Sequence, residues 1–281
     1  MLRVRVIDLE SSGDAPPEHG LVEIGYCDLV ANSADLLGEP CDWEVFGGFS
    51  ELVNPGCPIP PETSAVHHII DEDVAGGRPW REALPAFLDG DGVIAFAAHG
   101  ADFEAKWLSD ELRGGKPLIC TYKAAIRKFP AAPSHSNMGL RYWRNPDGLE
   151  RERALPAHRA FPDAYATAFL LRDVLNDGHT IAELAKWTGE PALLPRCKIG
   201  DYRNDGKGTP YSEVDSGMLR WIIRIMADDP RRENDVHTAR YHLEQREIDQ
   251  RLEYERMDLE RQLHANGLDD NNHLPATELP L

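Results

Sequence analysis

Two acidic side chains, Asp8 and Glu10, are separated by one residue and follow Val4-Arg5-Val6-Ile7, which has the pattern of a β-strand. Alternate side chains of a β-strand point to the same face, so the two carboxylates would lie side by side. Carboxylates held that close repel each other unless a cation lies between them, and their oxygens are the ligands that Mg²⁺ and Mn²⁺ prefer. The pair therefore indicates a divalent metal site, with a solvated pair of surface acids as the alternative.

Two further segments place carboxylates and a histidine at the ends of predicted elements. Asp102 and Glu104 follow an apolar strand at residues 92–98, where the chain turns into a helix. His158 and Asp163 are five positions apart, just before an alanine-rich helical pattern. Taken alone, each segment also has a structural explanation, because an acid at a helix start is an ordinary cap and a lone histidine is often a surface residue.

With one acid taken from the second segment, these segments together provide four carboxylates and one imidazole. Four carboxylates can hold two divalent ions about 3.5–4 Å apart, and such a pair of ions activates water for phosphodiester hydrolysis. An imidazole, whose ordinary pKa is about 6.5, is suited to accept a proton from that water. The combination predicts metal-dependent cleavage of phosphodiester bonds.

The elements that must position these groups follow from hydrophobic periodicity and turn residues. Three early strands joined by turns predict an antiparallel meander, and the later alternation of strand and helix predicts an α/β domain with a mixed sheet over residues 1–188. The expected strands cover residues 3–9, 21–29, 43–53 and 92–98. The expected helices cover residues 60–69, 80–88, 103–112, 121–128, 136–143 and 158–175.

The C-terminal third has a different pattern. A small α-rich unit is expected at residues 195–245, beginning with a glycine-rich turn at residues 200–207. Residues 231–264 predict one long charged helix, which is expected to pack on its own domain, with a short coiled coil as the alternative. Residues 266–281 predict a disordered tail. The helix and tail together are a candidate contact for a protein partner.

Composition limits the classes of function. The chain of 281 residues has a net charge of −18, which argues against a protein that coats nucleic acid. No apolar run is long enough for a membrane span, and the N-terminus begins directly with a strand pattern, so a cytoplasmic protein without a membrane partner is expected. Residues 113–153 nevertheless carry nine Lys and Arg against three acids, a net of +6, and are a candidate track for a nucleic-acid backbone.

The motifs resemble those of the DEDD exonucleases, in the histidine-bearing DEDDh branch, over residues 3–175. Val6-Ile7-Asp8-Leu9-Glu10 is similar to the first motif, and His158-Arg159-Ala160 through Asp163 is similar to the third. The resemblance implies a ribonuclease H-like fold and 3′–5′ exonuclease activity. It extends to a bacterial subfamily, the exodeoxyribonuclease X enzymes, through Ser136-Asn137-Met138, the turn at residues 200–207, and Leu219-Arg220-Trp221.

One departure from the family concerns the second motif, which reads His-Asn-Ala-x-Phe-Asp in relatives. Here it reads His99-Gly100-Ala101-Asp102-Phe103-Glu104. Keeping Ala101 and Phe103 in register assigns the ligand position to Glu104, which offers the same ligand atoms on a chain one methylene longer. Asp102 is the less favoured alternative, since it would require the helix start to shift by two residues.

The resemblance implies a role for each matching residue. Two divalent cations, Mg²⁺ or Mn²⁺, would be bound by four carboxylates, with His158 as general base. The implied metal ligands are Asp8, Glu10, Glu104 and Asp163. The expected substrate-binding residues are Leu9, His67, Lys123 and Arg127, and His67 has a structural role as its alternative. The expected substrate is the 3′ end of single- or double-stranded DNA, from which 5′-mononucleotides are released. An exoribonuclease of the same superfamily and a non-catalytic module that binds nucleic acid or a partner are the alternatives.

Overall fold

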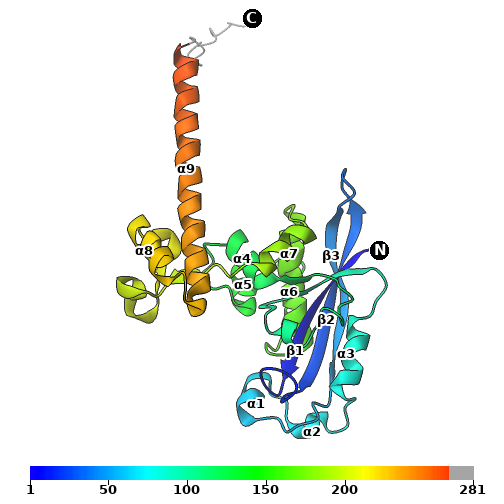
Figure 1. The fold of residues 1–281 in the computed structure, drawn as a ribbon. Helices are drawn as coiled ribbons and strands as arrows, with labels where there is room; N and C mark the ends of the chain where they lie inside the picture. The colour runs from blue at the N-terminus through cyan, green and yellow to red at the C-terminus, as the bar shows by residue number, and fades with distance from the viewer. Residues whose placement is uncertain (266–281) are drawn as a thin grey trace, which may run out of the picture. The chain divides into compact units, whose positions relative to one another are not determined.

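The structure of the chain is a computed structural model that describes residues 1–265 (Figure 1). The chain divides into two compact units, Met1–Leu193 and Leu194–Leu281, and each is described here by itself. The expected disordered tail at residues 266–281 lies outside the described residues.

The N-terminal unit, unit 1, is built on a five-stranded mixed sheet. Its strands are β1 Arg3–Ser11, β2 Leu21–Ala34, β3 Pro40–Leu52, β4 Val93–Ala98 and β5 Leu118–Cys120. The order across the sheet is β3-β2-β1-β4-β5, with β1, β2 and β3 antiparallel and with β4 and β5 parallel to β1. The predicted mixed α/β sheet is confirmed, and β1 is its central strand.

Helices cover both faces of this sheet (Figure 1). They are α1 Pro61–His67, α2 Asp71–Val74, α3 Trp80–Leu88, α4 Thr121–Lys128, α5 Asn137–Arg144, α6 Ala160–Asn176 and α7 Ile181–Gly189. Val4 and Val6 of β1 pack in one core cluster with residues of α6, whereas Ile7 and Leu9 pack in the other with residues of α3. The alternation of β1 thus divides its side chains between the two layers.

The prediction of a helix at residues 103–112 is wrong. The structure has only a short 3₁₀ turn there, Glu104–Lys106, followed by further turns. The Trp107 N–H donates to the Glu104 carbonyl three residues back, and the Leu112 N–H donates to the Ser109 hydroxyl, so turn and side-chain hydrogen bonds replace the regular α-helical pattern there. Three helices and strands of unit 1 had no prediction, namely helix α2, the short strand β5 and helix α7.

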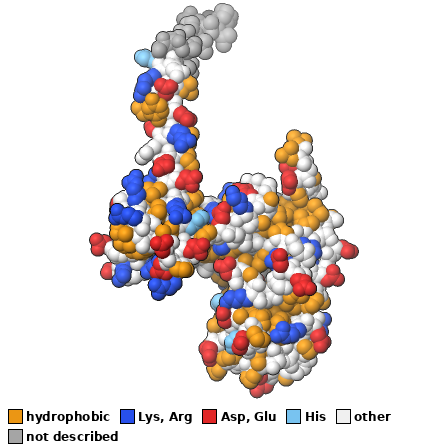
Figure 2. Space-filling model, in the orientation of Figure 1, with side chains coloured by type: hydrophobic (Ala, Val, Ile, Leu, Met, Phe, Trp, Pro, Cys, Tyr) orange, Lys and Arg blue, Asp and Glu red, His pale blue; other side chains and the backbone are white. Residues whose placement is uncertain are grey.

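The C-terminal unit, unit 2, has its own core. Its elements are β6 Arg196–Cys197, β7 Thr209–Pro210, α8 Ser216–Met226 and α9 Glu233–Ala265, with 3₁₀ turns at Gly200–Gly206, Tyr211–Glu213 and Pro230–Arg232. The buried core residues are Cys197, Ile199, Tyr211, Val214, Leu219, Ile222, Val236 and Ala239. Figure 2 shows Lys and Arg side chains spread over the visible face of this unit. Within residues 1–265, no helix combines the length and apolar character that a membrane crossing requires.

The predicted packing of α9 holds only for its first part. Val236 and Ala239 are buried in the unit 2 core, and the Arg246 guanidinium donates to the carbonyls of Ser212 and Val214. Further along, Ile248, Leu252 and Leu259 are exposed at 38%, 57% and 58%. The apolar seam of α9 is therefore open to solvent in the described residues.

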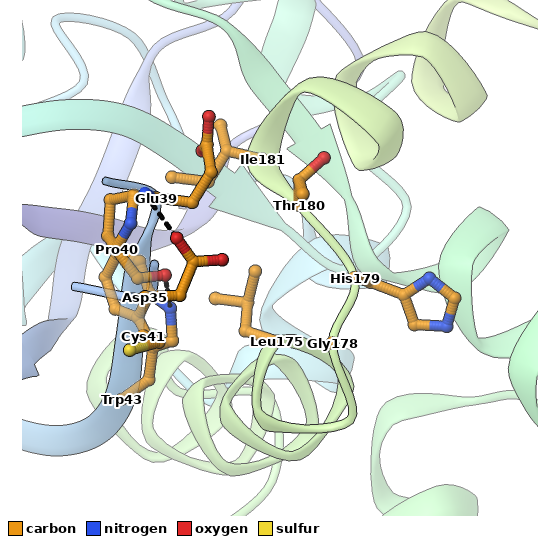
Figure 3. Close-up of a pocket in the computed structure, with 10 residues that line it drawn as sticks. All are labelled: Asp35, Glu39, Pro40, Cys41, Trp43, Leu175, Gly178, His179, Thr180 and Ile181. Carbon is orange, nitrogen blue, oxygen red and sulfur yellow. Dashed lines mark hydrogen bonds between the residues drawn. The ribbon is translucent and has the colours of Figure 1, made fainter. Parts of the chain in front are cut away.

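One hollow in unit 1 lies between the β2–β3 hairpin and the segment joining α6 to α7. Its lining residues are Asp35, Glu39, Pro40, Cys41, Trp43, Leu175, Gly178, His179, Thr180 and Ile181. The Asp35 carboxylate accepts the backbone N–H groups of Leu37 and Glu39, and the His179 ring turns away from the hollow (Figure 3). These polar groups hold a turn, so this hollow does not gather a catalytic constellation.

Candidate active site

Strand β1 places two carboxylates on the face that packs against α6. Asp8 and Glu10 continue the alternation of Val4 and Val6, whose side chains pack in the cluster with α6. Across the antiparallel pairing, Asp8 lies opposite Gly25 of β2, and Glu10 lies opposite Glu23. The predicted common orientation of Asp8 and Glu10 therefore brings both toward the start of α6.

Helix α6 supplies the third carboxylate from its first turn. Asp163 Oδ2 accepts the backbone N–H of His158 at 2.9 Å, and its carbonyl accepts Asn137 Nδ2 at 3.0 Å. Asp163 Oδ1 is buried and has no hydrogen-bond partner within residues 1–265. One oxygen is thus used to hold the preceding loop, and the other is left for a ligand.

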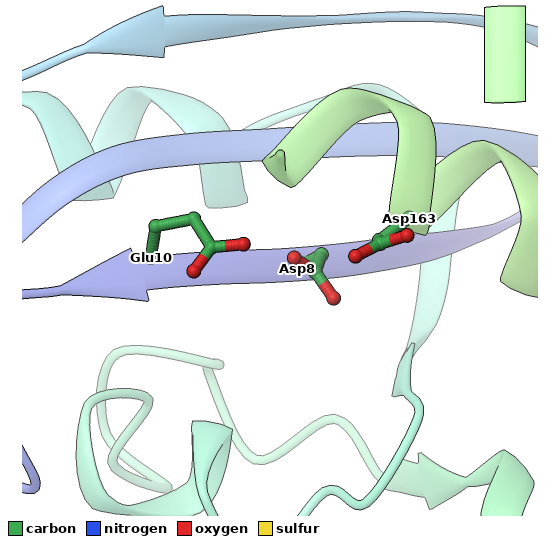
Figure 4. Close-up of side chains that lie close together, drawn as sticks. All are labelled: Asp8, Glu10 and Asp163. Carbon is green, nitrogen blue, oxygen red and sulfur yellow. The ribbon is translucent and has the colours of Figure 1, made fainter. Parts of the chain in front are cut away.

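Asp8, Glu10 and Asp163 come together as one carboxylate cluster (Figure 4). One oxygen from each of the three lies within 4.8 Å of the other two. Three hard oxygen donors at this spacing fit a divalent cation. The cluster joins a strand and a helix that are separated by about 150 residues of sequence.

The closeness of the cluster depends on a glycine. A Cβ placed on Gly25 would lie 2.5 Å from the backbone carbon of Ala160 and 2.6 Å from the nitrogen of Phe161. Because side chains do not approach backbone atoms so closely, only glycine permits this contact between β2 and the first turn of α6. Gly25 is also the residue paired with Asp8, so the contact lies directly beside the cluster.

A buried acid of β2, Glu23, fixes the same helix start and was not predicted as a site residue. Its carboxylate accepts Arg159 Nε at 2.7 Å and the backbone N–H of Ala160 at 3.1 Å, and it also accepts Ser50 Oγ at 2.6 Å. The sequence signal was an acid inside an apolar strand, which needs a partner when it is buried. Glu23 acts as a positioning residue for α6.

The electrostatics of the cluster favour uptake of a cation. Burial, followed by repulsion from Asp163, Glu10 and Glu104, raises the pKa of Asp8 well above its usual range. Burial and repulsion from Asp163 and Glu23 raise the pKa of Glu10 to about 8, although Arg159 opposes the shift. Burial also raises the pKa of Asp163, against the hydrogen bond from His158. A bound cation would relieve this repulsion and restore the ionised forms.

The two candidates of the second motif have different environments. Glu104 is 4% exposed, and its Oε2 is buried with no hydrogen-bond partner in the described chain. Burial, followed by repulsion from Glu10 and Asp102, raises the pKa of Glu104 to about 8. The Asp102 side chain is 85% exposed and lies 3.9 Å from Lys123 Nζ. Glu104 is not among the three residues within 4.8 Å, but its charge acts on both Asp8 and Glu10.

His158 lies in the loop just before α6. It is exposed, and its backbone is left-handed, with φ of 59°. Its N–H donates to Asp163, and the charge of a protonated His158 would lower the pKa of Asp163. The loop is therefore attached to the cluster through its backbone, while the imidazole remains accessible.

A cavity of about 250 Å³ opens beside Glu10. It is lined by Leu9, Glu10, Ser11, Glu62, Thr63, Val66, His67 and Phe103. His67 Nδ1 accepts the Ile69 N–H at 3.1 Å, whereas Nε2 is buried without a partner in the described residues. Burial lowers the pKa of His67, which favours a neutral imidazole at this wall. The structure thus brings two of the four expected substrate-binding residues, Leu9 and His67, next to the cluster.

The other two expected substrate-binding residues are held by protein groups. Lys123 is buried and donates to the carbonyls of Thr188 and Glu190, both at 2.8 Å. Arg127 forms an ion pair with Glu190 at 2.6 Å and lies over the ring of Trp187. These contacts fasten α4 to the end of α7, and they do not support the expected contacts of Lys123 and Arg127 with substrate.

Much of the basic stretch at residues 113–153 has similar internal contacts. Its ion pairs within unit 1 are Arg113–Asp110, Lys128–Asp177, Arg144–Asp173 and Arg153–Glu150. Arg153 also lies over the rings of Phe161 and Tyr165. The net positive charge of this segment therefore does not correspond to an equal number of unpaired cations.

Comparison with known proteins finds relatives that are described as exonucleases. A family model described as Exonuclease matches residues 6–171. Exodeoxyribonuclease 10 of Escherichia coli (strain K12) is 34% identical over 223 residues, which are 78% of this chain and 90% of that protein. A putative bifunctional exonuclease/endonuclease of Mycobacterium tuberculosis (strain CDC 1551 / Oshkosh) is 29% identical over 212 residues, covering 69% of this chain and 30% of that protein.

A solved structure extends the likeness to the fold. Exonuclease X in complex with 5′ overhanging duplex DNA is 32% identical, with a TM-score of 0.54, and covers 66% of this chain and 99% of that chain. The region matched by the family model includes the carboxylate cluster, Glu104 and His158. Enzymes of this family generally depend on divalent metal ions. The chain belongs to the Exonuclease family, within the DEDD superfamily, and is a 3′–5′ exonuclease.

Proposed function

We propose that this exonuclease is an exodeoxyribonuclease that uses two Mg²⁺ or Mn²⁺ ions and releases 5′-mononucleotides from the 3′ ends of DNA. The observation that carries the proposal is the carboxylate cluster, in which three partly buried acids converge within 4.8 Å and each has a raised pKa. The preference for DNA is supported by the relatives, an exodeoxyribonuclease and an exonuclease structure with bound duplex DNA.

Asp8, Glu10, Glu104 and Asp163 would hold the metal ions. The unpartnered oxygens of Asp163 and Glu104 fit this role, because a buried oxygen without a hydrogen bond is costly unless a cation or water occupies its lone pairs. When bound, two such ions acidify a water molecule and stabilise charge on the leaving oxygen. Glu23 and Gly25 keep the first turn of α6 close to β1, so that acids of both elements could bind the same metal ions.

His158 would accept the proton of the attacking water. Its exposed imidazole is free to approach a bound strand, while its backbone N–H keeps the loop against Asp163. General bases placed in this way contribute about 10²–10⁴-fold to turnover. Asp163 then has two functions, since one oxygen orients the histidine loop and the other faces the metal site.

The cavity beside Glu10 would receive the terminal nucleoside. Leu9 and Phe103 offer apolar surface for a base or sugar, and His67 offers its buried Nε2 as the polar contact. Because Nδ1 accepts the Ile69 N–H, a neutral His67 carries its proton on Nε2, and this N–H would donate to a sugar hydroxyl or a phosphate ester oxygen.

Matched DNA and RNA oligomers with a 5′ label test the function. With Mg²⁺, the wild-type chain is expected to shorten DNA one nucleotide at a time from the 3′ end, faster than RNA, and to release 5′-mononucleotides. His158→Ala is expected to lower kcat about 10²–10⁴-fold while Mn²⁺ binding measured by titration calorimetry is retained. Asp8→Asn is expected to lose both metal binding and activity.

Three results would contradict the proposal. Equal or faster cleavage of RNA would assign an exoribonuclease. Activity of His158→Ala within a few-fold of wild type would remove His158 from the role of base. No Mg²⁺-dependent release of nucleotides at all would favour a non-catalytic binding module.

A further inference from the structure

Unit 2 carries a set of exposed cations that pair with no acid among residues 1–265. They are Lys198, Arg203, Lys207, Arg220 and Arg224, and they are called the cationic surface below. Their side chains form no ion pair or hydrogen bond with any residue of the described chain. Residues 194–232 contain eight Lys and Arg and six Asp and Glu, 8 − 6 = +2, in a chain of net charge −18.

Helix α8 presents its part of this surface on one side. With 100° per residue, Arg220, Arg224, Trp221 and Ile225 fall in that order within an arc of about 140°. The buried Leu219 and Ile222 fall on the opposite side, in the core of unit 2. Trp221 is 37% exposed and Ile225 is 56% exposed, so an aromatic ring and an aliphatic side chain lie directly beside two free guanidinium groups.

The turn that carries the other cations is ordered and attached to the start of α8. The Gly208 N–H donates to the Arg203 carbonyl at 2.8 Å, which closes the turn. The Tyr202 hydroxyl donates to Asp215, the N-cap of α8, and a Cβ on Gly200 would lie 4.0 Å from Met218 Cε. The lysines and arginines of the turn are therefore held on a folded backbone next to α8.

We propose that this surface binds the phosphate backbone of a nucleic-acid strand, with Trp221 stacking on an unpaired base. The inference rests on the proposed function, because the substrate of the enzyme is a polyanion. Free cations interleaved with an exposed aromatic ring are the elements of sequence-independent binding to single strands. An acidic protein would match the charges but would give no reason for the tryptophan beside them.

The two kinds of contact have different signatures in a salt series. Each phosphate contact by a cation contributes about 0.7 to the slope of log K against log salt for single strands, whereas stacking contributes to affinity and not to the slope. The full-length chain is titrated against a fluorescent 30-nucleotide strand in EDTA, so that no cleavage occurs. Removing three cations, in Arg203→Gln/Arg220→Gln/Arg224→Gln, is expected to reduce the slope by about 2. Trp221→Ala is expected to lower affinity about tenfold with an unchanged slope.

A matched control removes the same charge from another part of unit 2. The triple variant Arg251→Gln/Arg256→Gln/Arg261→Gln lies on the later part of α9, where Arg256 pairs with Glu253 and Glu260, and it is expected to keep the wild-type slope. All variants are checked for an unchanged thermal midpoint, since the substituted side chains are exposed. An unchanged slope in the first triple variant, or an equal loss in the control, would overturn the proposal. Mg²⁺-dependent nucleotide release by the wild-type chain is measured separately, so a failure of the proposed function is distinguished from a failure of this surface.

Discussion

The carboxylate cluster of unit 1 and the cationic surface of unit 2 both concentrate charges of one sign, and they do so in opposite environments. Asp8, Glu10 and Asp163 are partly withdrawn from water, and burial raises the pKa of each. The five cations of the cationic surface are exposed to solvent. Burial would make the first region a selective site for a small cation, whereas exposure would make the second a weak and salt-sensitive site.

The difference shows what each region requires from the fold. The cluster needs a sheet, a helix start and a glycine contact to bring the acids together, and the repulsion among them opposes folding until a cation is bound. The cationic surface needs only an ordered turn and one exposed helix side. The first region should therefore be sensitive to single substitutions and to metal, and the second to the number of charges and to salt.

The prediction with the largest expected effect tests whether Glu104 acts together with the carboxylate cluster. Glu104→Gln removes a buried charge beside Asp8 and Glu10 and is expected to lower kcat by about a hundredfold or more, since the loss of a metal ligand removes several kcal/mol of transition-state stabilisation. Asp102→Asn is the matched control and is expected to stay within threefold, because its side chain is in solvent. Measuring kcat against Mg²⁺ concentration checks both. A silent Glu104 variant beside an inactive Asp102 variant would reverse the assignment.

A second prediction concerns pH and metal. The folded-state pKa of about 8 for Glu10 and Glu104 exceeds the unfolded value of about 4.3, so the folded chain binds more protons between these limits. In EDTA, the stability present below about pH 4.3 should therefore be lost progressively as pH rises through about 8. Mg²⁺ should raise Tm by several degrees at pH 8 and by less at pH 6, because binding requires ionised ligands.

Calorimetric or fluorescence melting across this pH range gives the measurement. Glu104→Gln should flatten the dependence in EDTA, whereas Glu111→Gln, a substitution of an exposed acid, should leave it unchanged. A stability that rises with pH between 6 and 8 in EDTA, with Mg²⁺ having no effect, would show that the acids do not form a repulsive buried cluster.

The smallest expected effect separates paired from free cations. Arg144 forms an ion pair with Asp173 at 2.6 Å and lies over the Phe129 ring, so Arg144→Met should lower the free energy of unfolding by about 1 kcal/mol. The salt slope of strand binding should not change, because this cation is already used inside unit 1. Urea unfolding and the salt series together check the prediction. A reduced slope with unchanged stability would instead place Arg144 on the nucleic-acid path.

Much of this molecule follows from local sequence. The alternation in β1 predicts the shared face of Asp8 and Glu10, and the apolar strand at residues 93–98 is long enough to be recognised. The motif register also assigns the ligand position to Glu104 rather than Asp102, and Glu104 is the buried residue of the two.

Other features depend on contacts between distant segments. Glu23 is bound by Arg159 and Ala160, which lie more than 130 residues further along, so its role has no local pattern. Lys123 is basic in sequence, but the carbonyls that hold it come from the end of α7. Composition counts charges, and only the folded chain shows which of them are already neutralised by other protein groups.

The geometry of the carboxylate cluster depends on the absence of a side chain at Gly25, a residue that is not itself acidic. Two main-chain segments touch there, and the spread of the ligand oxygens is determined by how near those segments come. A single methyl group at this position would push these segments apart, so a chain that kept every acid of the cluster could still lose the spacing that a divalent cation requires. A related chain that keeps all the acidic residues of the motif can therefore still lack nuclease activity if another residue replaces this glycine.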